Sequence, residues 1–284
     1  MAGLREGSRT RPISVRPRKT IMGIYRLLLA ILVAISHAGI SFYDYNPGVV
    51  AVISFYILSG YVMSMLIGKY YKRPSVVPTF YLDRAVRLFP QFVFYTILSS
   101  ILIYFLKLDS PFLNTLNIYN WWLNFLMLPQ AFYMFWPDAG WLVIPQSWSL
   151  GLEVTFYLVI PWILIYFSKR QVYTLACASF CIFLAAYFGI INSDFYGYRL
   201  LPGTLFMFIV GWSFFQNDSD SRKFRIIVLF SAGALLLIAL LNESLYQMPY
   251  NKEVLVGLMI GILAVSTIRR FSFSNLDEFL GNLS

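Results

Sequence analysis

The sequence predicts an all-α protein, a polytopic bundle of about eight or nine transmembrane helices. Hydrophobic residues make up 59% of its 284 residues and charged residues 12%, and the mean hydropathy is +0.67. A water-soluble globule of this length needs a larger share of polar residues to cover its surface. We therefore expect residues 24–284 to form one membrane domain behind a basic N-terminal tail at 1–23.

Eight apolar runs are long enough to cross a hydrocarbon core of about 30 Å as helices. They cover residues 24–43, 49–68, 88–106, 147–167, 172–191, 199–215, 224–241 and 253–268. A ninth run, 118–136, is less regular because polar residues and a proline interrupt it: Asn120, Asn124, Pro129 and Gln130. The connections between the runs are short, so we expect no separate soluble domain.

The positions of Lys and Arg predict how the chain crosses the membrane. With a cytoplasmic N-terminus and a re-entrant segment at 118–136, 19 of the 22 basic residues face the cytoplasm and three face outward. If 118–136 crosses, the ratio falls to 14 to 8. Cytoplasmic loops are enriched in Lys and Arg, which favours the re-entrant or interfacial arrangement. The net charge of +9 then reflects orientation, and we expect no nucleic-acid partner.

The first run contains Arg26 and His37, with no other ionisable group between them. Eleven residues at about 100° each bring both side chains to nearly the same face of a helix, roughly 16 Å apart along its axis. One end of this helix could hold a phosphate and its other half a base. Ionisable residues inside a membrane are costly, so function is the default hypothesis. A histidine that is hydrogen-bonded for packing alone is the alternative.

The second and third runs add small residues and arginines. Ser59 and Gly60 would let another backbone or an acyl chain approach closely, although helix packing alone also explains them. Arg84 and Arg87 lie one turn apart in the cytoplasmic loop before the third run, so both guanidiniums can face one anion. Together with Arg26 they could ring one cytoplasmic entrance, although loop arginines can also serve orientation alone.

The run at 147–167 carries a polar stripe in an otherwise apolar helix. Ser149, Glu153 and Tyr157 follow an i, i+4, i+8 spacing, which places them on one face. Glu153 and His37 each lie six residues from the outer end of their predicted helices, about 9 Å deep. A histidine and a carboxylate at matched depth could form a base and its orienting partner. Two unrelated polar residues, each satisfied separately, are the alternative.

In order and spacing, these motifs resemble those of the acyltransferase 3 family of integral-membrane acyltransferases. The resemblance covers residues 20–168, with a weaker continuation over 199–211, and its motifs are Arg26-x10-His37, Phe55-Tyr56-x-x-Ser59-Gly60, Arg84-x-x-Arg87-x-x-Pro90 and Trp148-Ser149-Leu150-x-x-Glu153-x-x-Phe156-Tyr157-Leu158. Two features depart from the family pattern. Residues 279–284 resemble the segment before the family's last transmembrane helix, but the chain stops there, and Val154 stands where the family often has a second acidic residue.

The resemblance implies transfer of an acyl group, most often acetyl, from cytoplasmic acyl-CoA to a hydroxyl of a surface glycan or glycolipid. It places the protein in the bacterial inner membrane, with acyl-CoA as donor substrate and with no bound cofactor or metal. In this interpretation Arg26, Arg84 and Arg87 bind the donor phosphates. His37 acts as general base or transient acyl acceptor, and Glu153 orients it and stabilises its cationic form.

Attack on a thioester also needs a hydrogen-bond donor for the oxyanion. Trp148 or Ser149 could supply it, and Ser59, Gly60 and Tyr157 are further candidate substrate contacts. A rival hypothesis is a transporter or flippase in which the histidine and the glutamate relay protons. A third is a degenerate, non-catalytic family member that lacks the last helix.

Overall fold

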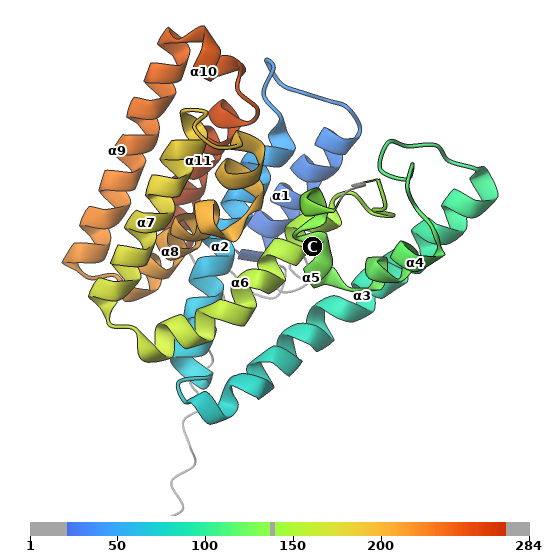
Figure 1. Ribbon diagram of the computed structural model, residues 1–284. Coiled ribbons are helices and arrows are strands. Elements are labelled where there is room, and N and C mark those ends of the chain that lie inside the picture. Colours follow the sequence, from blue (N-terminus) through green and yellow to red (C-terminus); the bar gives the residue numbers. More distant parts are fainter. Residues whose placement is uncertain (1–21, 137–139, 271–284) are drawn as a thin grey trace, which may run out of the picture.

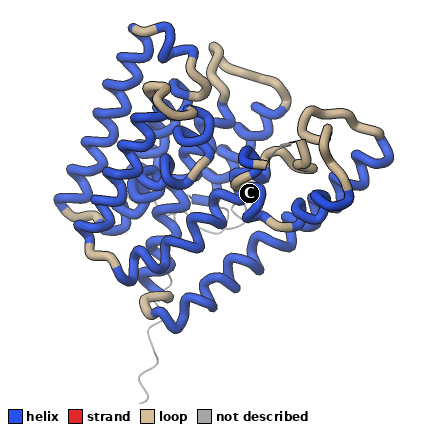
Figure 2. The backbone as a smooth tube through the Cα atoms, viewed as in Figure 1, coloured by secondary structure: helices blue, strands red, loops and turns tan. Residues whose placement is uncertain are grey.

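The computed structural model describes residues 22–136 and 140–270, and its regular structure is helical (Figures 1 and 2). The long helices are α1 (Met22–His37), α2 (Pro47–Tyr70), α3 (Val77–Leu106), α6 (Ser147–Tyr166), α7 (Lys169–Tyr187), α8 (Leu201–Gln216), α9 (Ser219–Leu241) and α11 (Asn251–Ile268). Short helices in the connections are η1 (Pro74–Val76), α4 (Ile118–Trp121), η2 (Trp122–Phe125), α5 (Met127–Gln130), η3 (Tyr133–Phe135), η4 (Phe195–Arg199) and α10 (Glu243–Gln247).

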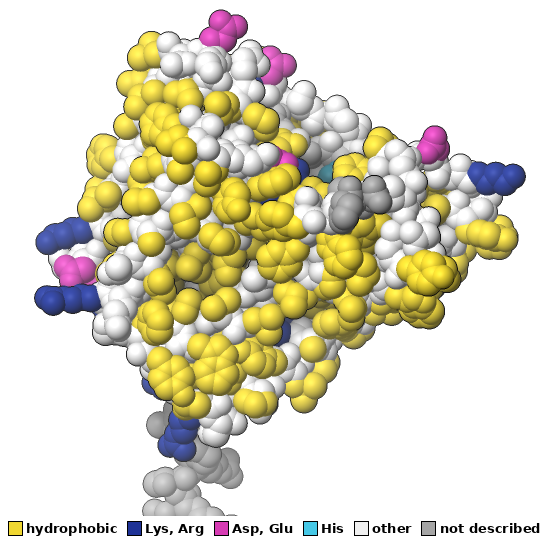
Figure 3. Space-filling model, in the orientation of Figure 1, with side chains coloured by type: hydrophobic (Ala, Val, Ile, Leu, Met, Phe, Trp, Pro, Cys, Tyr) yellow, Lys and Arg dark blue, Asp and Glu magenta, His cyan; other side chains and the backbone are white. Residues whose placement is uncertain are grey.

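Seven helical segments in the described part of the chain are long and apolar enough to cross a membrane. With 16 residues, α1 is shorter. Apolar side chains spread over much of the face in Figure 3, and the charged side chains lie mainly towards its margins. The all-α polytopic bundle that the sequence predicts is therefore confirmed. Most of the expected basic tail and the segment 279–284 lie outside the described residues.

Successive long helices run in opposite directions, which gives the bundle two ends. We call one the arginine end; it holds the start of α1 and the connections 71–76, 167–168 and 217–218. The other, the histidine end, holds the connections 38–46, 107–146, 188–194 and 242–250. Contacts join the connections at each end: Lys169 pairs with Asp218, and the backbone N–H of Asn46 donates to Glu253 Oε1 at 3.3 Å. This alternation is the one expected when 118–136 does not cross.

The segment 118–136 is a chain of short helical pieces. None of its pieces exceeds four residues, whereas a crossing needs about 20. Asn124 and Gln130 are buried, and their side-chain amides bind backbone groups within the segment and in the loop that follows it. Asn124 Nδ2 donates to the carbonyl oxygen of Trp141 at 2.9 Å, and Gln130 Nε2 donates to that of Asn124 at 3.1 Å. The polar residues and the proline that interrupt this apolar run therefore prevent a continuous helix over 118–136.

The first helix is shorter than its apolar run. The sequence predicts a span to residue 43, but α1 ends at His37. Gly39 follows with φ +79°, a left-handed conformation that glycine adopts without strain and that ends a helix. Phe42 and Tyr45 then form an isolated bridge. His37 is therefore the terminal residue of its helix instead of lying six residues inside it.

The third helix is longer than its apolar run. It begins at Val77 instead of residue 88, so Arg84 and Arg87 lie on the helix and not in a loop. A proline in the first turn favours this start, because its missing N–H has no partner there anyway. The outer part of α3 leans away from the other helices (Figure 1). Its last residues are exposed, with Tyr104 at 78% and Phe105 at 73%.

The centre of the bundle is the contact between α2 and α8. Gly60 and Gly211 face the backbone of the opposite helix, because a Cβ on Gly60 would lie 1.9 Å from the carbonyl oxygen of Phe208, and a Cβ on Gly211 would lie 2.0 Å from that of Ile57. Small residues permit such close approach where the lipid offers no hydrophobic driving force. The surface of Gly60 is thus filled by α8, which favours its packing role over substrate contact.

We predict that Gly211→Ala destabilises the bundle by about 1–3 kcal/mol, because the added methyl group has no room. The measurement is the thermal unfolding midpoint in detergent. Gly233→Ala is the matched control: it lies within α9 with nothing within 4 Å of the added Cβ, and alanine favours a helix by up to about 1 kcal/mol. Equal loss of stability in both variants would contradict this packing account.

Candidate active site

The arginine end brings together the three arginines that the sequence predicts as a phosphate site. Arg26 comes from α1, and Arg84 and Arg87 come from α3. The Arg26 guanidinium interacts electrostatically with both of them and with Glu153 and Tyr157 of α6. Three guanidiniums and one carboxylate leave a positive charge in a partly desolvated place. Such a cluster is suited to an anion that carries more than one negative charge.

Glu153 is held in this cluster by two hydroxyl groups. Ser59 Oγ of α2 donates to Glu153 Oε1 at 2.7 Å, and the Tyr157 hydroxyl donates to the same oxygen. The predicted stripe on α6 is thus a contact between side chains one turn apart. Because it interacts electrostatically with Arg26, Glu153 belongs with the arginine cluster.

His37 lies apart from that cluster, at the histidine end. It lines a cavity of about 290 Å³ together with Trp148 and Ser149. Glu153 is the seventh residue of α6 and lies about 9 Å along the helix from its start, whereas His37 terminates α1. The expected matching depth is therefore wrong. In the described structure, no hydrogen bond joins the two side chains, and their catalytic roles stay predictions.

Arg199 also lines the His37 cavity. Its Nε donates to Asp194 Oδ1 at 2.7 Å. Its guanidinium carbon lies over four aromatic rings, with distances of 4.5 to 6.0 Å to their centroids: Trp148, Tyr198, Tyr250 and Tyr133. Burial raises the pKa of the Tyr133 phenol, which the charge of Arg199 partly opposes. The cavity therefore combines flat apolar faces with hydrogen-bond donors.

The sequence pattern does not reveal the pair of Arg199 and Asp194. They are five residues apart, whereas side chains that meet on an α-helix are three or four residues apart. The π-helical turn η4 spans Phe195–Arg199 and brings the pair together. Such turns recur at functional sites, but no composition signal marks this one.

A hydrogen-bond network fixes the end of α1 and with it His37. Asn46 Oδ1 accepts from Ser36 Oγ at 2.7 Å and from the backbone N–H of Gly48 at 2.9 Å. The backbone N–H of Asn46 donates to the buried Glu253 of α11. The network joins α1, α2 and α11, and its members are too distant in sequence to be linked by spacing.

The remaining predicted contacts divide between the two ends. Ser59 and Tyr157 bind Glu153 at the arginine cluster. Trp148 and Ser149 line the His37 cavity, where Ser149 Oγ donates to the carbonyl oxygen of Gln146 at 2.9 Å. Within the described ranges, no group of three or more His, Cys, Asp and Glu residues is placed to hold a metal ion.

Comparison with known proteins identifies the family. The family model for acyltransferase 3, described as an acyltransferase domain, matches residues 22–284. The chain belongs to the acyltransferase 3 family. An uncharacterized protein of Aquifex aeolicus (strain VF5) is 32% identical over 145 residues, which cover 48% of this chain and 64% of that relative. The match thus spans less than two thirds of the relative's length. No solved structure matches the chain.

For this acyltransferase-family protein, we predict that Asp194 and Arg199 are energetically coupled. Asp194→Asn or Arg199→Gln should each cost about 1.5–3 kcal/mol, the usual contribution of a hydrogen bond to a charged group. The double variant should lose less than the sum of the two, because either change alone leaves the other group partly buried and unpaired. Unfolding of all four proteins in detergent measures this coupling. Additive losses would show that the pair does not interact.

Proposed function

We propose that this membrane protein transfers an acyl group, preferably acetyl, from acyl-CoA to a hydroxyl of a glycan or glycolipid. The observation that supports this most is the separation of two sites along α1. Arg26 lies in an anion-binding cluster and His37 in an aromatic cavity, with roughly 16 Å of helix between them. Acyl-CoA has the matching form, because a long, thin pantetheine arm separates its phosphates from its thioester.

In this proposal the arginine end faces the cytoplasm of a bacterium and receives the donor. Arg26, Arg84 and Arg87 bind the donor's diphosphate, for which the planar fork of arginine is suited. Glu153 holds Arg26 in place and partly offsets the repulsion among the three guanidiniums. The electrostatic interaction between Glu153 and Arg26 supports this role, which differs from the one expected from the sequence, in which Glu153 orients His37.

His37 acts at the other end of the arm. As a general base, its imidazole takes the proton of the acceptor hydroxyl while that oxygen attacks the thioester carbonyl carbon. The C–S bond then breaks, the new C–O bond remains as the ester, and the proton passes to the CoA thiolate. Alternatively, His37 first takes the acyl group itself and passes it to the hydroxyl. Both routes give one ester and one free thiol.

The His37 cavity is the proposed acceptor site. The faces of Trp148, Tyr198 and Tyr250 can stack against the apolar face of a sugar ring, and the indole and phenol groups add polar edges. Arg199, which Asp194 holds in place, offers hydrogen-bond donors for sugar hydroxyls. The cavity volume of about 290 Å³ suits a small part of a larger glycan.

The test of this function is turnover of labelled acetyl-CoA by the purified protein in lipid nanodiscs. We predict that His37→Ala reduces acetyl-CoA hydrolysis and acetyl transfer by about 100-fold or more, the usual contribution of a general base. The variant should keep the wild-type unfolding midpoint. Near wild-type transfer by the variant would remove His37 from the mechanism. Substrate transport without thioester cleavage would instead favour a transporter.

Arginine variants test the donor site separately. Arg84→Ala and Arg87→Ala should each raise the donor KM by about 10- to 100-fold, because each removes a charge-assisted contact of about 1.5–3 kcal/mol. Lysine should restore binding only in part, since it cannot bind in a bidentate manner. Arg170→Ala is the control, because this exposed arginine lies at the same end on α7. An unchanged donor KM in both cluster variants would exclude a phosphate site there.

A further inference from the structure

The arginine end contains a second cavity that the proposed reaction does not use. Its volume is about 370 Å³, and it lies among α2, α6, α7 and α8. It shares no lining residue with the His37 cavity. Its lining includes the aromatic side chains of the buried Trp212 and the exposed Phe215, together with Lys72 and Lys169. Its volume lies within the range of about 300–1,000 Å³ that is typical of small-molecule sites.

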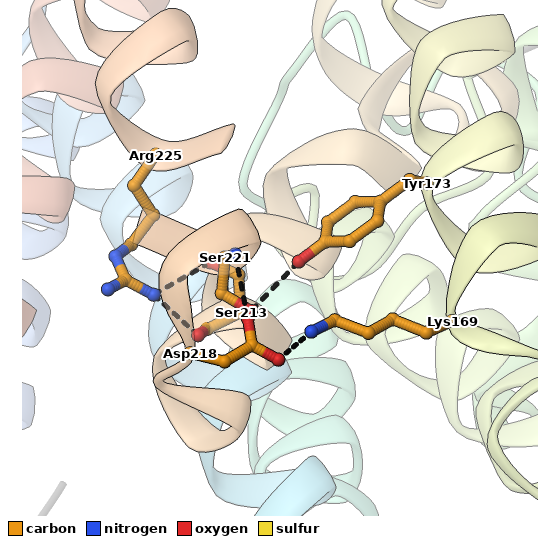
Figure 4. A network of polar contacts seen from close by, with 6 residues as sticks. All are labelled: Lys169, Tyr173, Ser213, Asp218, Ser221 and Arg225. Atoms are coloured by element: carbon orange, nitrogen blue, oxygen red, sulfur yellow. Dashed lines mark hydrogen bonds and ion pairs between the residues drawn. The ribbon is translucent and has the colours of Figure 1, made fainter. Parts of the chain in front are cut away.

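The rim of this cavity carries a positive charge. Lys169 reaches from α7 to Asp218, whose other oxygen accepts from the backbone N–H of Ser221 at 2.9 Å (Figure 4). Asp218 is thus engaged both as an ion-pair partner and as the cap of α9. Lys72 is exposed and has no ion-pair partner among the described residues. Two ammonium groups against one carboxylate favour an anionic ligand at the mouth.

The mouth of the cavity is adjacent to the arginine cluster. Lys72 follows Tyr71, whose hydroxyl donates to Asp83 on α3. The Tyr71 ring meets the Phe80 ring edge to face at 5.3 Å, and the Arg84 guanidinium lies 5.9 Å from the centroid of that same Phe80 ring. A ligand bound at Arg84 can therefore extend past the end of α2 to reach Lys72.

We propose that this cavity binds the adenosine 3′-phosphate end of the acyl-CoA donor. The inference rests on the proposed function, in which the diphosphate lies at the arginines and the pantetheine arm extends towards His37. The nucleotide must then lie on the other side of the diphosphate. Trp212 and Phe215 offer apolar surface for the adenine base, and Lys72 and Lys169 offer ammonium groups for the 3′-phosphate.

Three donors test the proposal: acetyl-CoA, acetyl-dephospho-CoA, which lacks only the 3′-phosphate, and acetyl-pantetheine, which lacks both the nucleotide and the diphosphate. The wild type should have a KM about tenfold lower for acetyl-CoA than for acetyl-dephospho-CoA. Lys72→Gln should remove that difference by raising the KM for acetyl-CoA alone. Phe215→Leu should raise the KM for both nucleotide donors and leave acetyl-pantetheine unaffected. Lys223→Gln, an exposed lysine on α9 at the same end, should change none of the three.

The outcomes separate this inference from the proposed function. Equal KM values for acetyl-CoA and acetyl-dephospho-CoA in the wild type, or a phosphate preference that persists in Lys72→Gln, would overturn the nucleotide site and leave the transfer reaction intact. A folded protein that cleaves none of the thioesters would overturn the proposed function. Direct binding of adenosine 3′,5′-bisphosphate, measured in neutral-lipid nanodiscs, should then still weaken about tenfold in Lys72→Gln. Loss of anionic-lipid binding alone in that variant would assign the cavity to a lipid headgroup.

Discussion

The cost of placing charge inside an apolar bundle is the constraint on which the rest of this structure depends. A charged group buried without compensation destabilises a protein strongly, and the penalty is offset only where partners surround the group. Glu153 has two hydroxyl donors and interacts electrostatically with Arg26, and Arg199 has Asp194. Asp194 and Tyr157 are local partners, from the same turn or helix, whereas Ser59 reaches Glu153 from α2 only in the complete fold. The fold therefore supplies the partners that offset the cost of burying these charges. In turn, the need for these partners determines which segments pack against each other.

Most of the fold is predictable from the sequence because crossing a membrane demands long apolar runs. The segment 118–136, which the distribution of Lys and Arg argues against as a spanning helix, is broken into short pieces, and its buried Asn124 binds backbone groups of Trp141 and Val143 outside the segment. Apolarity does not determine where helices end. Gly39 stops α1 within an apolar run, and α3 begins eleven residues before its apolar run. Local backbone preferences set both boundaries, and they are independent of the membrane.

The candidate site is predictable where its residues share a helix or a face, and not elsewhere. The i, i+4 spacing of Glu153 and Tyr157 corresponds to a contact in the structure. The matched depth expected for Glu153 and His37 assumed that α1 extends to residue 43, whereas α1 ends at His37. Arg199 is recognisable only once a π-helical turn and rings from distant segments surround it. Residues that meet from distant segments in this way have no regular spacing in the sequence, so a single sequence does not reveal their contact.

The close contact between α2 and α8 also limits how the protein can move. At both Gly60 and Gly211, a carbonyl oxygen of the opposite helix occupies the place of a Cβ. If one helix slid along the other, residues with larger side chains would move to these positions and clash with the backbone of the opposite helix. The two helices must therefore move as one body. Any opening that admits a substrate falls to peripheral elements such as α3, whose outer part is already largely free of neighbours. The pair of α2 and α8 is therefore a rigid core, and substrate access depends on movement of helices at the periphery of the bundle.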